Sequence, residues 1–418
     1  MRERVVIVGA GIVGLTLAYA LNRRGWTVTV VESTTPGHGA SDVNAGWICP
    51  SHVEPVPAPG LMRQSLKWMR HSDSPLYIQP RLSGDMAMWL LAFWRHCSTQ
   101  AFRSGIEATA ALSKQTFHLY DEMRASGVQF EEHRTGVIYV YESPGRLEKS
   151  YRAFSEVARN HSIETSELIW GDDLRNVEPA LSDSVCGGYW IRQDRQVLPQ
   201  SLNSGLVSYL TERGVDIRRN LPVVGFDVAG DRVTDVIFQR GRLETDAVVI
   251  AAGAWSPEVT KLARRRIPIQ AGKGYALDYT PAPISVQHAL HVDAGRHAIT
   301  PFDGMTRLAG TMEFSGINER IRPERVNAII CSAARTLQGW PTDLSIPRIQ
   351  SGLRPMSADG LPIIGWLPGY RNLAVATGHG MLGFTLAPAT AEALTDLITT
   401  HIMPSILRPF DPGRFGWL

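Results

Sequence analysis

The chain has 418 residues, of which 44% are hydrophobic and 20% charged, a composition typical of a globular protein with about two or three domain-sized cores. Its 42 basic and 40 acidic residues leave a formal net charge of +2, too small to indicate binding to nucleic acid or to an acidic membrane surface. The 4 cysteines stand singly with no CxxC pair, so neither a zinc ribbon nor an iron–sulfur cluster is expected.

The first predicted element is a buried strand that runs directly into a glycine-rich turn. Residues 5–14 read VVIVGAGIVG, an apolar run followed by the pattern G-x-G-x-x-G. This pattern lets the backbone approach a pyrophosphate at the N-terminus of the following helix. A second apolar run, at residues 27–31, ends in Glu32, whose carboxylate can accept hydrogen bonds from an adenosine ribose and would repel a 2′-phosphate. Together these elements predict a site for FAD or NAD.

Two apolar stretches bear on a membrane location. The first, residues 5–21, contains the glycines of the dinucleotide pattern and is followed by no small-residue cleavage site, so we expect a cytoplasmic protein. The second, residues 86–94, is the most apolar helix candidate and is too short to span a bilayer. For this segment we favour burial in a core over a face that docks on a membrane or on a partner.

Further along the chain, a proline-rich loop at residues 50–59 is followed by alternating helical and strand patterns. The predicted helices are 61–70, 85–96, 106–124 and one with Leu202, Leu206 and Leu210 on one face and Gly214 as its C-terminal cap. The predicted strands are 137–141, 223–228, 233–238, 247–250, 361–365 and 373–377. Residues 267–314 alternate strand-like runs with turns, so we expect a sheet-rich second domain inserted between separated segments of the nucleotide-binding domain.

A second glycine-rich strand end lies near the C-terminus, where residues 377–385 read TGHGMLGFT before an apolar helix. A helix N-terminus stabilises developing negative charge. A reduced flavin carries such charge over its N1–C2=O edge, whereas a nicotinamide ring does not. FAD is therefore the better match.

Four motifs in chain order carry a resemblance to the D-amino-acid oxidase superfamily of flavoproteins. They are the glycine turn with Glu32, SDVNAG at 41–46, GLRPMSADGLPIIG at 352–365 and TGHGMLGFTLAP at 377–388. Within the superfamily the chain most resembles the small subunits of bacterial D-amino-acid dehydrogenases. This similarity extends to residues 58–60, 66–69, 177–180 and 273–275, and so covers nearly the whole chain.

The resemblance implies an α/β fold in which a glutathione-reductase-like Rossmann FAD domain is built from separated segments. An α+β substrate domain on a large mixed sheet is inserted between these segments. We expect the FAD domain to consist of residues 1–50, 150–265 and 346–418. We expect the substrate domain to consist of residues 51–149 and 266–345.

The motifs and the resemblance together indicate which residues contact FAD. These are Gly9, Gly11, Ile12, Val13, Gly14, Glu32, Ser33, Ser41, Asn44, Ala45, Gly46, Trp47, Val223, Ala252, Gly253, Trp255, Gly378, His379, Gly380, Met381, Leu382 and Gly383. Relatives with covalent flavin have a cysteine near the GLRP motif or a histidine near the NAG motif. Here these places hold Gly352, Leu353, Val43 and Asn44, so the FAD is expected to be non-covalent.

The predicted catalytic residues are Arg354, Tyr275 and His379. Arg354 stands where relatives bind the substrate carboxylate, and its planar guanidinium can make two parallel hydrogen bonds. Tyr275 could add a hydroxyl to the carboxylate or amine, and it could equally be an ordinary sheet tyrosine. We expect His379 to face the flavin ring and form a hydrogen bond rather than transfer a proton. Arg307 is expected to be a solvated strand residue rather than one that points to the flavin, and no metal site is assigned.

We therefore predict an FAD-dependent enzyme that deaminates neutral D-amino acids to the 2-oxo acid and ammonia, with hydride transfer from Cα to flavin N5. Alternatives are an FAD-dependent dehydrogenase or oxidase of N-methyl or cyclic imino acids or of a 2-hydroxy acid, and a non-catalytic or tRNA-modifying flavoprotein. Trp47 and Met381 depart from the family pattern beside the flavin and leave the side-chain preference open. The electron acceptor is expected to be a quinone or another acceptor. Contacts with a partner subunit or with the cytoplasmic face of the inner membrane stay open.

Overall fold

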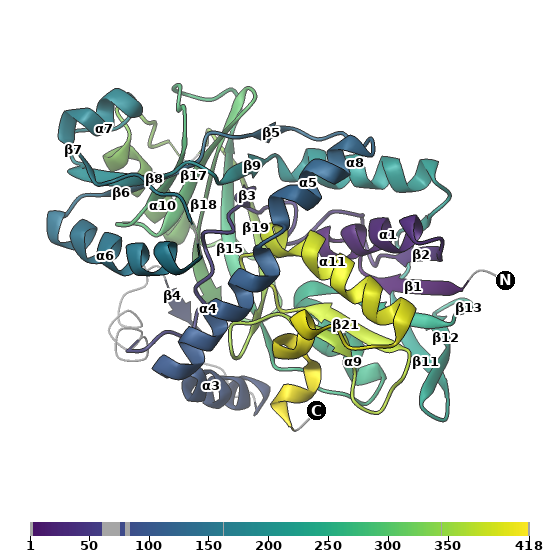
Figure 1. The fold of residues 1–418 in the computed structure, drawn as a ribbon. Coiled ribbons are helices and arrows are strands. Elements are labelled where there is room, and N and C mark those ends of the chain that lie inside the picture. The colour runs from purple at the N-terminus through teal and green to yellow at the C-terminus, as the bar shows by residue number, and fades with distance from the viewer. Residues whose placement is uncertain (1–2, 61–75, 80–83, 162, 344, 417–418) are drawn as a thin grey trace.

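The computed structural model describes residues 3–60, 76–79, 84–161, 163–343 and 345–416. The helix predicted at 61–70 and the similarity noted at 66–69 lie outside these residues. Two large sheets organise the molecule. A six-stranded sheet lies at the end that carries the N-terminus, and a nine-stranded sheet lies at the other end (Figure 1).

The six-stranded sheet has the strand order β10-β2-β1-β14-β21-β20, in which all neighbours are parallel except β20 and β21. Its strands are β1 (Arg4–Val8), β2 (Thr27–Val31), β10 (Asp216–Arg218), β14 (Ala247–Ile250), β20 (Ile363–Trp366) and β21 (Leu373–Thr377). Strands β14 and β21 are buried along their whole length, as expected for parallel strands that are covered on both faces.

Helices cover one face of this sheet and share one apolar core. They are α1 (Ile12–Arg23), α8 (Pro199–Glu212) and α11 (Gly383–Thr400), joined by α4 (Thr99–Ser113) and α5 (Thr116–Ala125). A second apolar core lies on the other face. The elements on that side are β11 (Val223–Ala229), β12 (Arg232–Phe238), β13 (Arg242–Glu244) and α9 (Ser256–Leu262).

The nine-stranded sheet has the order β19-β15-β18-β17-β16-β6-β8-β7, with β4 beside β18. Neighbours are antiparallel except for β16 with β6 and β18 with β4. Its strands are β4 (Leu76–Ile78), β6 (Val137–Tyr141), β7 (Ile169–Trp170), β8 (Gly187–Ile191), β15 (Ile269–Tyr279), β16 (Ala289–Val292), β17 (His297–Phe302), β18 (Met305–Phe314) and β19 (Arg348–Ser357).

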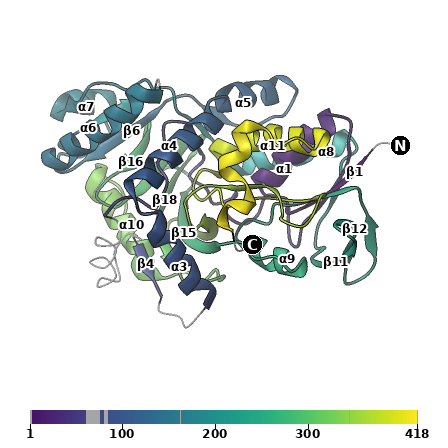
Figure 2. The same ribbon diagram turned by 60° about the horizontal axis from the view of Figure 1, so that its bottom comes forward.

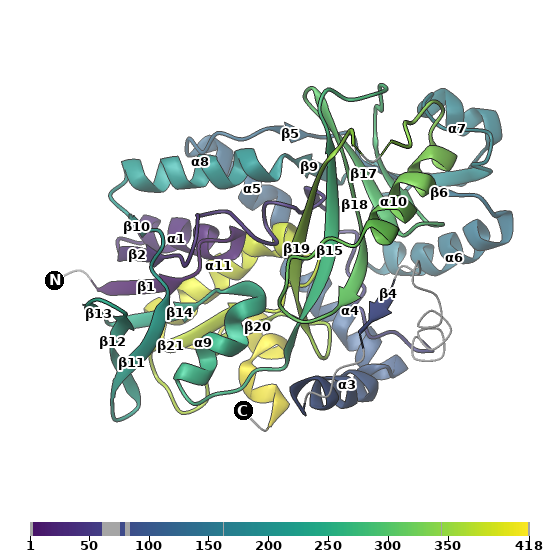
Figure 3. The same cartoon turned by 180° about the vertical axis from the view of Figure 1, so that it is seen from behind.

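Helices pack on opposite faces of the nine-stranded sheet. Helix α10 (Pro323–Thr336) covers one face, and α6 (Pro144–His161) covers the other face at the β6–β8 end. Figure 3 shows β15 and β19 between α10 on one side and α11 on the other. The other elements are α3 (Gly84–His96), α7 (Gly171–Val177), a short sheet of β3 (Trp47–Ile48), β9 (Arg195–Val197) and β5 (Glu132–His133), and the 3-10 helices η1 (Gly253–Trp255), η2 (Ser405–Phe410) and η3 (Pro412–Phe415).

The predicted α/β class, with a Rossmann-like sheet assembled from separated segments and a large mixed second sheet, is confirmed. The helix predicted at 106–124 is wrong in one respect, because α4 and α5 are separate helices that meet at residues 114–115. Both pack against α11, and Leu112 and Tyr120 belong to the apolar core of the six-stranded sheet.

The boundaries between the FAD domain and the substrate domain stay a prediction. The pairing of strands in the two sheets favours different boundaries. Strands β7 and β8 lie within the segment 150–265 and β19 lies within 346–418, yet all three pair in the nine-stranded sheet. Helices α4 and α5 lie within 51–149 but pack in the other lobe. We propose that the substrate domain includes β7, β8 and β19 and that α4 and α5 belong to the FAD domain.

Helix α3 is apolar on both faces. Met86, Trp89 and Phe93 are buried, whereas Met88 is 45%, Leu91 49% and Trp94 59% exposed. The expected burial in a core therefore describes one face only, and α3 lies at an edge of the molecule (Figure 2). Among the residues that the structure describes, no helix combines the length and apolar character needed to cross a membrane.

Candidate active site

The turn between β1 and α1 has no room for side chains. Gly9 has a φ of +112°, and a Cβ on it would lie 2.5 Å from the carbonyl oxygen of Ala251. A Cβ on Gly14 would lie 2.0 Å from the carbonyl oxygen of Gly9. Glycine is therefore required at both positions for α1 to follow the turn this closely.

The N-terminus of α1 opens toward the same turn. Gly11 is its N-cap residue and offers no side chain to the first N–H groups. Ser41 reaches over from the next loop, and its Oγ accepts the N–H of Ile12 at 3.0 Å. The helix dipole and the free N–H groups of a first turn, to which Val13 also belongs, favour an anion such as a pyrophosphate here.

Glu32 lies directly beside this turn, as its position after β2 predicts. Its Oε2 accepts the N–H of Ala10 at 2.9 Å, and its Oε1 accepts the hydroxyl of Ser33 at 3.1 Å. Val223 begins β11 close by, since the N–H of Leu221 donates to the Glu32 carbonyl oxygen at 2.8 Å. The structure thus brings Glu32, Ser33 and Val223 to one end of the sheet.

The loop after β14 joins the same edge of the sheet. Gly253 has a φ of +54°, follows Ala252 and opens η1, which ends at Trp255. Its carbonyl oxygen accepts the hydroxyl of Thr377, the last residue of β21, at 2.9 Å. The carboxyl ends of β1, β14 and β21 therefore meet, which is where open α/β sheets bind ligands.

The loop that contains residues 41–46 is tightly fixed. Asn44 Oδ1 accepts the N–H of Gly46 at 2.8 Å, and Gly46 has a φ of +80°. Trp47 Nε1 donates to Thr300 Oγ1 at 2.8 Å, and the Thr300 hydroxyl donates to the carbonyl oxygen of Ala45 at 2.9 Å. This loop therefore lies against β17 of the nine-stranded sheet.

Arg307 is not solvated, which corrects the expectation from the sequence. It is fully buried and makes two hydrogen bonds to Asp278, at 2.6 and 2.8 Å. Its Nη1 also donates to the carbonyl oxygens of Asp42 and Asn44, at 3.0 and 2.8 Å. Its charge and donors are thus used to fasten the 41–46 loop to the sheet.

The second glycine loop links β21 to α11. Gly378 and Gly380 have φ values of +79° and +54°, and the N–H of Gly380 donates to the carbonyl oxygen of Pro355 at 3.1 Å. Met356 and His379 form an isolated β-bridge. Three further predicted residues complete the loop, namely Met381, which is 42% exposed, Leu382, the N-cap of α11, and Gly383, its first residue. The loop therefore lies directly against the strand that carries Arg354.

His379 is buried and turned in part toward α11. Its Nε2 lies 3.0 Å from Thr390 Oγ1, while its Nδ1 is buried without a hydrogen-bond partner in the described part of the chain. Burial lowers the pKa of His379 to about 3, so the ring is neutral near pH 7. A neutral ring agrees with the expectation that His379 does not transfer protons, and its contact with the flavin stays a prediction.

Tyr275 lies on the face of β15 opposite Arg354, and its hydroxyl is already bonded there, which counts against its predicted role. Its side chain is 1% exposed, and its hydroxyl donates to Glu313 Oε2 at 2.8 Å. Successive residues of a strand point to opposite faces, so Tyr275 points away from the side that Gly274 opens. We call the face with Gly274 and Arg307 the inner face and the face with Tyr275 the outer face.

Arg354 lies on the inner face as a half-buried cation without a counter-charge. Its Nη1 donates to the carbonyl oxygen of Thr311 at 2.9 Å, and it forms no ion pair with any described residue. Desolvation lowers its pKa to about 10, so it still carries its charge at neutral pH. A desolvated cation that lacks a counter-charge among the described residues is costly, which makes the position suited to a carboxylate ligand.

The sequence analysis missed how Arg354 is accommodated. A Cβ on Gly274 would lie 2.1 Å from Arg354 Nη1, so only a glycine leaves space for the guanidinium to cross β15. The sequence does hold a signal for this arrangement, because Gly272 and Gly274 stand at alternate positions of one strand and therefore on the same face. It could be interpreted only once β15 was known to pair with β19.

The described residues fit an FAD. The crowded glycines of the first turn leave the backbone bare where a pyrophosphate would approach, and Glu32 ends the adjacent strand. The unpartnered Nδ1 of His379 is a buried polar atom of the kind that a bound ring system can satisfy. The individual FAD contacts stay predictions.

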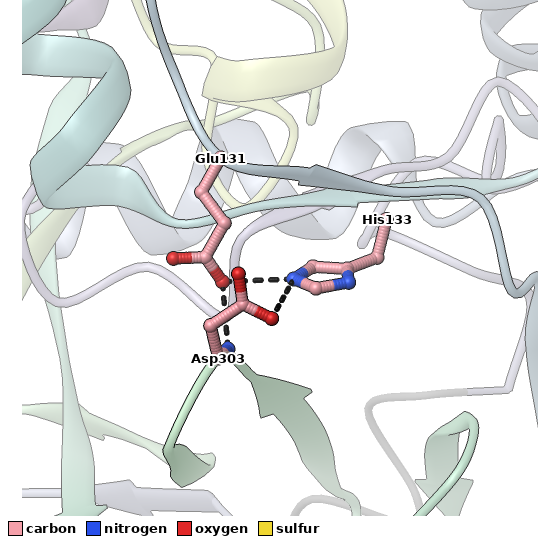
Figure 4. A group of neighbouring side chains, drawn as sticks. All are labelled: Glu131, His133 and Asp303. Atoms are coloured by element: carbon pink, nitrogen blue, oxygen red, sulfur yellow. Dashed lines mark hydrogen bonds and ion pairs between the residues drawn. The ribbon is translucent and has the colours of Figure 1, made fainter.

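One other group of ligand-type side chains, Glu131, His133 and Asp303, comes together among the described residues (Figure 4). Glu131 Oε1 accepts the backbone N–H of Asp303 at 2.9 Å and lies 2.8 Å from His133 Nε2. The Asp303 side chain is 82% exposed. These contacts hold β5 against the turn after β17, which accounts for the group without a metal ion. The absence of a metal site stays a prediction.

The comparisons with known proteins agree with this site. The profile of the FAD dependent oxidoreductase family, DAO, matches residues 4–397. The D-amino acid dehydrogenase of Cereibacter sphaeroides is 33% identical over 405 residues, which cover 94% of this chain and 91% of that protein.

Solved structures show the same fold at lower identity. L-proline dehydrogenase from P. horikoshii has a TM-score of 0.78 at 20% identity, covering 99% of this chain and 98% of that one. Glycine oxidase from Geobacillus kaustophilus has a TM-score of 0.77 at 22% identity, covering 99% of both chains. With its profile match, its dinucleotide turn and its second glycine loop, the chain belongs to the FAD dependent oxidoreductase family.

Proposed function

We propose that the protein oxidises a neutral D-amino acid to the 2-oxo acid and ammonia, with Arg354 binding the substrate carboxylate. The observation that carries the proposal is the guanidinium of Arg354, which forms no ion pair with a described residue and lies on the strand that bridges to the His379 loop. The relative named D-amino acid dehydrogenase, 33% identical over most of the chain, supports the amino acid and its handedness.

Positioning accounts for most of the catalysis in this proposal. When bound, FAD supplies the acceptor for the hydride that leaves Cα. Arg354 holds the carboxylate by two parallel hydrogen bonds, and the backbone contact to Thr311 fixes the guanidinium in turn. The neutral His379 adds no charge that would compete for the carboxylate. The imino acid that results is hydrolysed by water to the 2-oxo acid and ammonia.

An anaerobic spectral screen tests this function. The yellow protein is mixed with D- and L-alanine, D- and L-phenylalanine, sarcosine, L-proline and D-lactate, and bleaching of the flavin is followed. Faster bleaching by the D-amino acids than by their L-enantiomers supports the proposal. Faster bleaching by sarcosine, L-proline or D-lactate would assign the same carboxylate site to an N-methyl amino acid, a cyclic imino acid or a 2-hydroxy acid.

We also propose that the FAD is non-covalent. No cysteine or histidine stands at Val43, Asn44, Gly352 or Leu353, the positions where covalent relatives link the flavin. Acid precipitation should therefore release the yellow colour into the supernatant. Colour that stays in the pellet would contradict the proposal.

We further propose a cytoplasmic protein that contacts the membrane peripherally and passes its electrons to a quinone there, and the exposed face of α3 supports the membrane contact. Met88, Leu91 and Trp94 form an exposed apolar face on one side of the helix. Co-sedimentation with phospholipid vesicles is expected for the native protein and should be lost when all three residues are changed to Ser. Reoxidation by a ubiquinone analogue should be faster than by oxygen. Release of hydrogen peroxide in step with product would instead assign oxygen as the acceptor.

A further inference from the structure

The inner face of the nine-stranded sheet carries a row of paired residues that begins beside Arg354. Direct cross-strand partners follow one another in the order Ala276, Ala309, Ala298, His291, Tyr139 and Tyr189. Directly paired residues point to the same face, and Ala276 shares its face with Gly274, under the Arg354 guanidinium. The row therefore has a floor of three methyl groups between Arg354 and a set of aromatic rings.

The far end of the row is a compact aromatic group. The rings of His291 and Tyr139 stack with centroids 4.6 Å apart and an angle of 20°. The Tyr139 hydroxyl lies 3.0 Å from His52 Nδ1, and the two imidazole rings are 6.4 Å apart. Trp47 adds a ring 6.3 Å from His291. We call His52, Tyr139 and His291 the side-chain wall.

One polar atom of this wall has no hydrogen-bond partner among the described residues. His291 Nδ1 is buried without a hydrogen-bond partner in the described part of the chain, although such atoms are normally paired. Neither His52 nor His291 forms an ion pair with a described residue, and both rings are half-buried rather than enclosed. Burial lowers the pKa of both rings, to about 3 for His291, so the wall is uncharged near neutral pH.

The spacing along the row matches the size of an aromatic amino acid. The Arg354 guanidinium crosses β15 at Gly274, and His291 lies on β16, three strands further along the sheet, so the two are about three strand spacings, or about 14 Å, apart. An amino acid whose carboxylate is held by Arg354 can extend over the alanine floor toward the wall. A methyl side chain ends short of the wall, whereas a benzyl side chain reaches it.

We propose that the side-chain wall sets the substrate preference, so that the enzyme favours neutral aromatic D-amino acids over D-alanine, D-lysine and D-glutamate. The inference rests on the proposed function, because it takes the carboxylate to be bound by Arg354. Stacked rings offer a flat apolar surface to an aromatic side chain. A charged side chain would be desolvated there without a counter-charge in the wall.

Two variants and one control test the proposal in the FAD-loaded protein. Ala298→Leu places a larger side chain between Arg354 and the side-chain wall, and His291→Ala removes one ring of that wall. Each should lower the ratio of kcat/KM for D-phenylalanine to that for D-alanine at least fivefold. Tyr141→Phe is the matched control, since Tyr141 lies two residues from Tyr139 on the same face and donates instead to Ser150 at 2.6 Å. It should leave the ratio within twofold of the native value.

A binding measurement separates this proposal from the proposed function, because it needs no turnover. Titration of the flavin absorbance with 3-phenylpropionate and with acetate should give tighter binding of the aromatic acid in the native protein. Ala298→Leu and His291→Ala should remove that preference, even if no D-amino acid reduces the flavin. If the native protein and both variants, each with full FAD content, show the same preference for 3-phenylpropionate over acetate, the proposed role of the side-chain wall is wrong. If no D-amino acid bleaches the flavin but the binding preference is present, the proposed oxidation of D-amino acids is wrong and the role of the side-chain wall stands.

Discussion

Two groups of charged side chains on opposite faces of strand β15, Glu313 with its cations and Arg354, differ in whether the described part of the chain supplies a counter-charge. On the outer face, Glu313 is within 3.0 Å of Lys273, 3.2 Å of Arg322 and 3.6 Å of Arg325. On the inner face, Arg354 crosses the same strand, donates to the carbonyl oxygen of Thr311 and lies 4.0 Å from Met312 Sδ, and it forms no ion pair with a described residue. The charges around Glu313 neutralise one another within the protein, whereas Arg354, which has no ion pair among the described residues, is available to bind an anionic ligand.

A second unpaired charge lies elsewhere, with the opposite sign. Asp194 is fully buried, accepts the hydroxyl of Ser51 and forms no ion pair with a described residue. Burial raises its pKa to about 7, in contrast to Glu313, whose pKa is lowered because the bonds from its partners outweigh the effect of burial. Buried carboxyls in this molecule therefore differ in charge according to whether a cation is supplied.

The largest expected effect comes from removing the anion of the outer face. Glu313→Gln keeps the side-chain size but removes the carboxylate that Lys273, Arg322 and Arg325 share. Arg322 then keeps Glu324, at 4.0 Å, as an ion-pair partner. The free energy of unfolding should fall by about 3–5 kcal/mol, measured by urea denaturation. Glu244→Gln is the control, because it loses only a surface pair with Arg4 and should unfold at the native urea concentration. Equal midpoints for both variants would show that the outer cluster does not stabilise the fold.

The corresponding change on the inner face should affect function rather than folding. Arg354→Ala should lower kcat/KM by about 2–5 kcal/mol of transition-state binding, since a desolvated carboxylate loses its partner. The FAD content should be unchanged. Arg348→Ala is the control, because Arg348 is exposed on the same strand. Normal kcat/KM in the Arg354→Ala protein would place the carboxylate elsewhere.

The unpaired Asp194 should make stability depend on pH. Its pKa is higher in the folded protein than in an unfolded chain, so the folded state binds the proton more tightly and the contribution of Asp194 to stability falls as pH rises toward 7. Between pH 5 and 8 this contribution should fall by about 3 kcal/mol, or about two pKa units at about 1.4 kcal/mol each, while the buried rings of His291, His297 and His379 contribute in the opposite direction. Asp194→Asn should lose this slope in urea denaturation at the two pH values. The exposed control Asp303→Asn should keep it, and equal slopes in the two variants would assign the pH dependence to another group.

The smallest effect should come from filling the space that Arg354 uses. Gly274→Ala places a Cβ against the guanidinium and should lower kcat/KM by about 1–2 kcal/mol, mainly through KM. Gly225→Ala is the matched control, since a Cβ at that strand glycine would meet only Ile237 at an ordinary 3.5 Å. Unchanged kinetics for Gly274→Ala would mean that Arg354 can bind substrate in another rotamer.

The sequence was sufficient where a local pattern fixes the geometry. The turn at Gly9 and Gly14 and the acid at Glu32 are read from spacing alone, because each requires a backbone shape that few residues permit. Arg354 was predicted from a motif, and the structure adds that no carboxylate of the described segments pairs with it. The family and its cofactor follow from these patterns and are confirmed by the profile match.

The sequence was insufficient where long-range pairing decides. Tyr275 was placed in the site, but strand parity turns it to the outer face, and parity depends on the register with β19. Arg307 looked like a surface residue until Asp278 on the adjacent strand proved to be its partner. The split between α4 and α5 carries no strong breaker at residues 114–115, since neither glycine nor proline stands there.

The backbone contacts between the Arg354 strand and the second glycine loop have a mechanical consequence. Pro355 accepts the N–H of Gly380, Met356 bridges to His379, and the Met356 carbonyl oxygen also accepts Trp89 Nε1 at 3.0 Å. The residue that holds the carboxylate and the loop expected to cradle the ring are thus coupled by hydrogen bonds rather than by a hinge. Relative motion of the two lobes should therefore move the Arg354 strand and the second glycine loop together. Substrates with different side chains should therefore share one geometry at the reacting carbon.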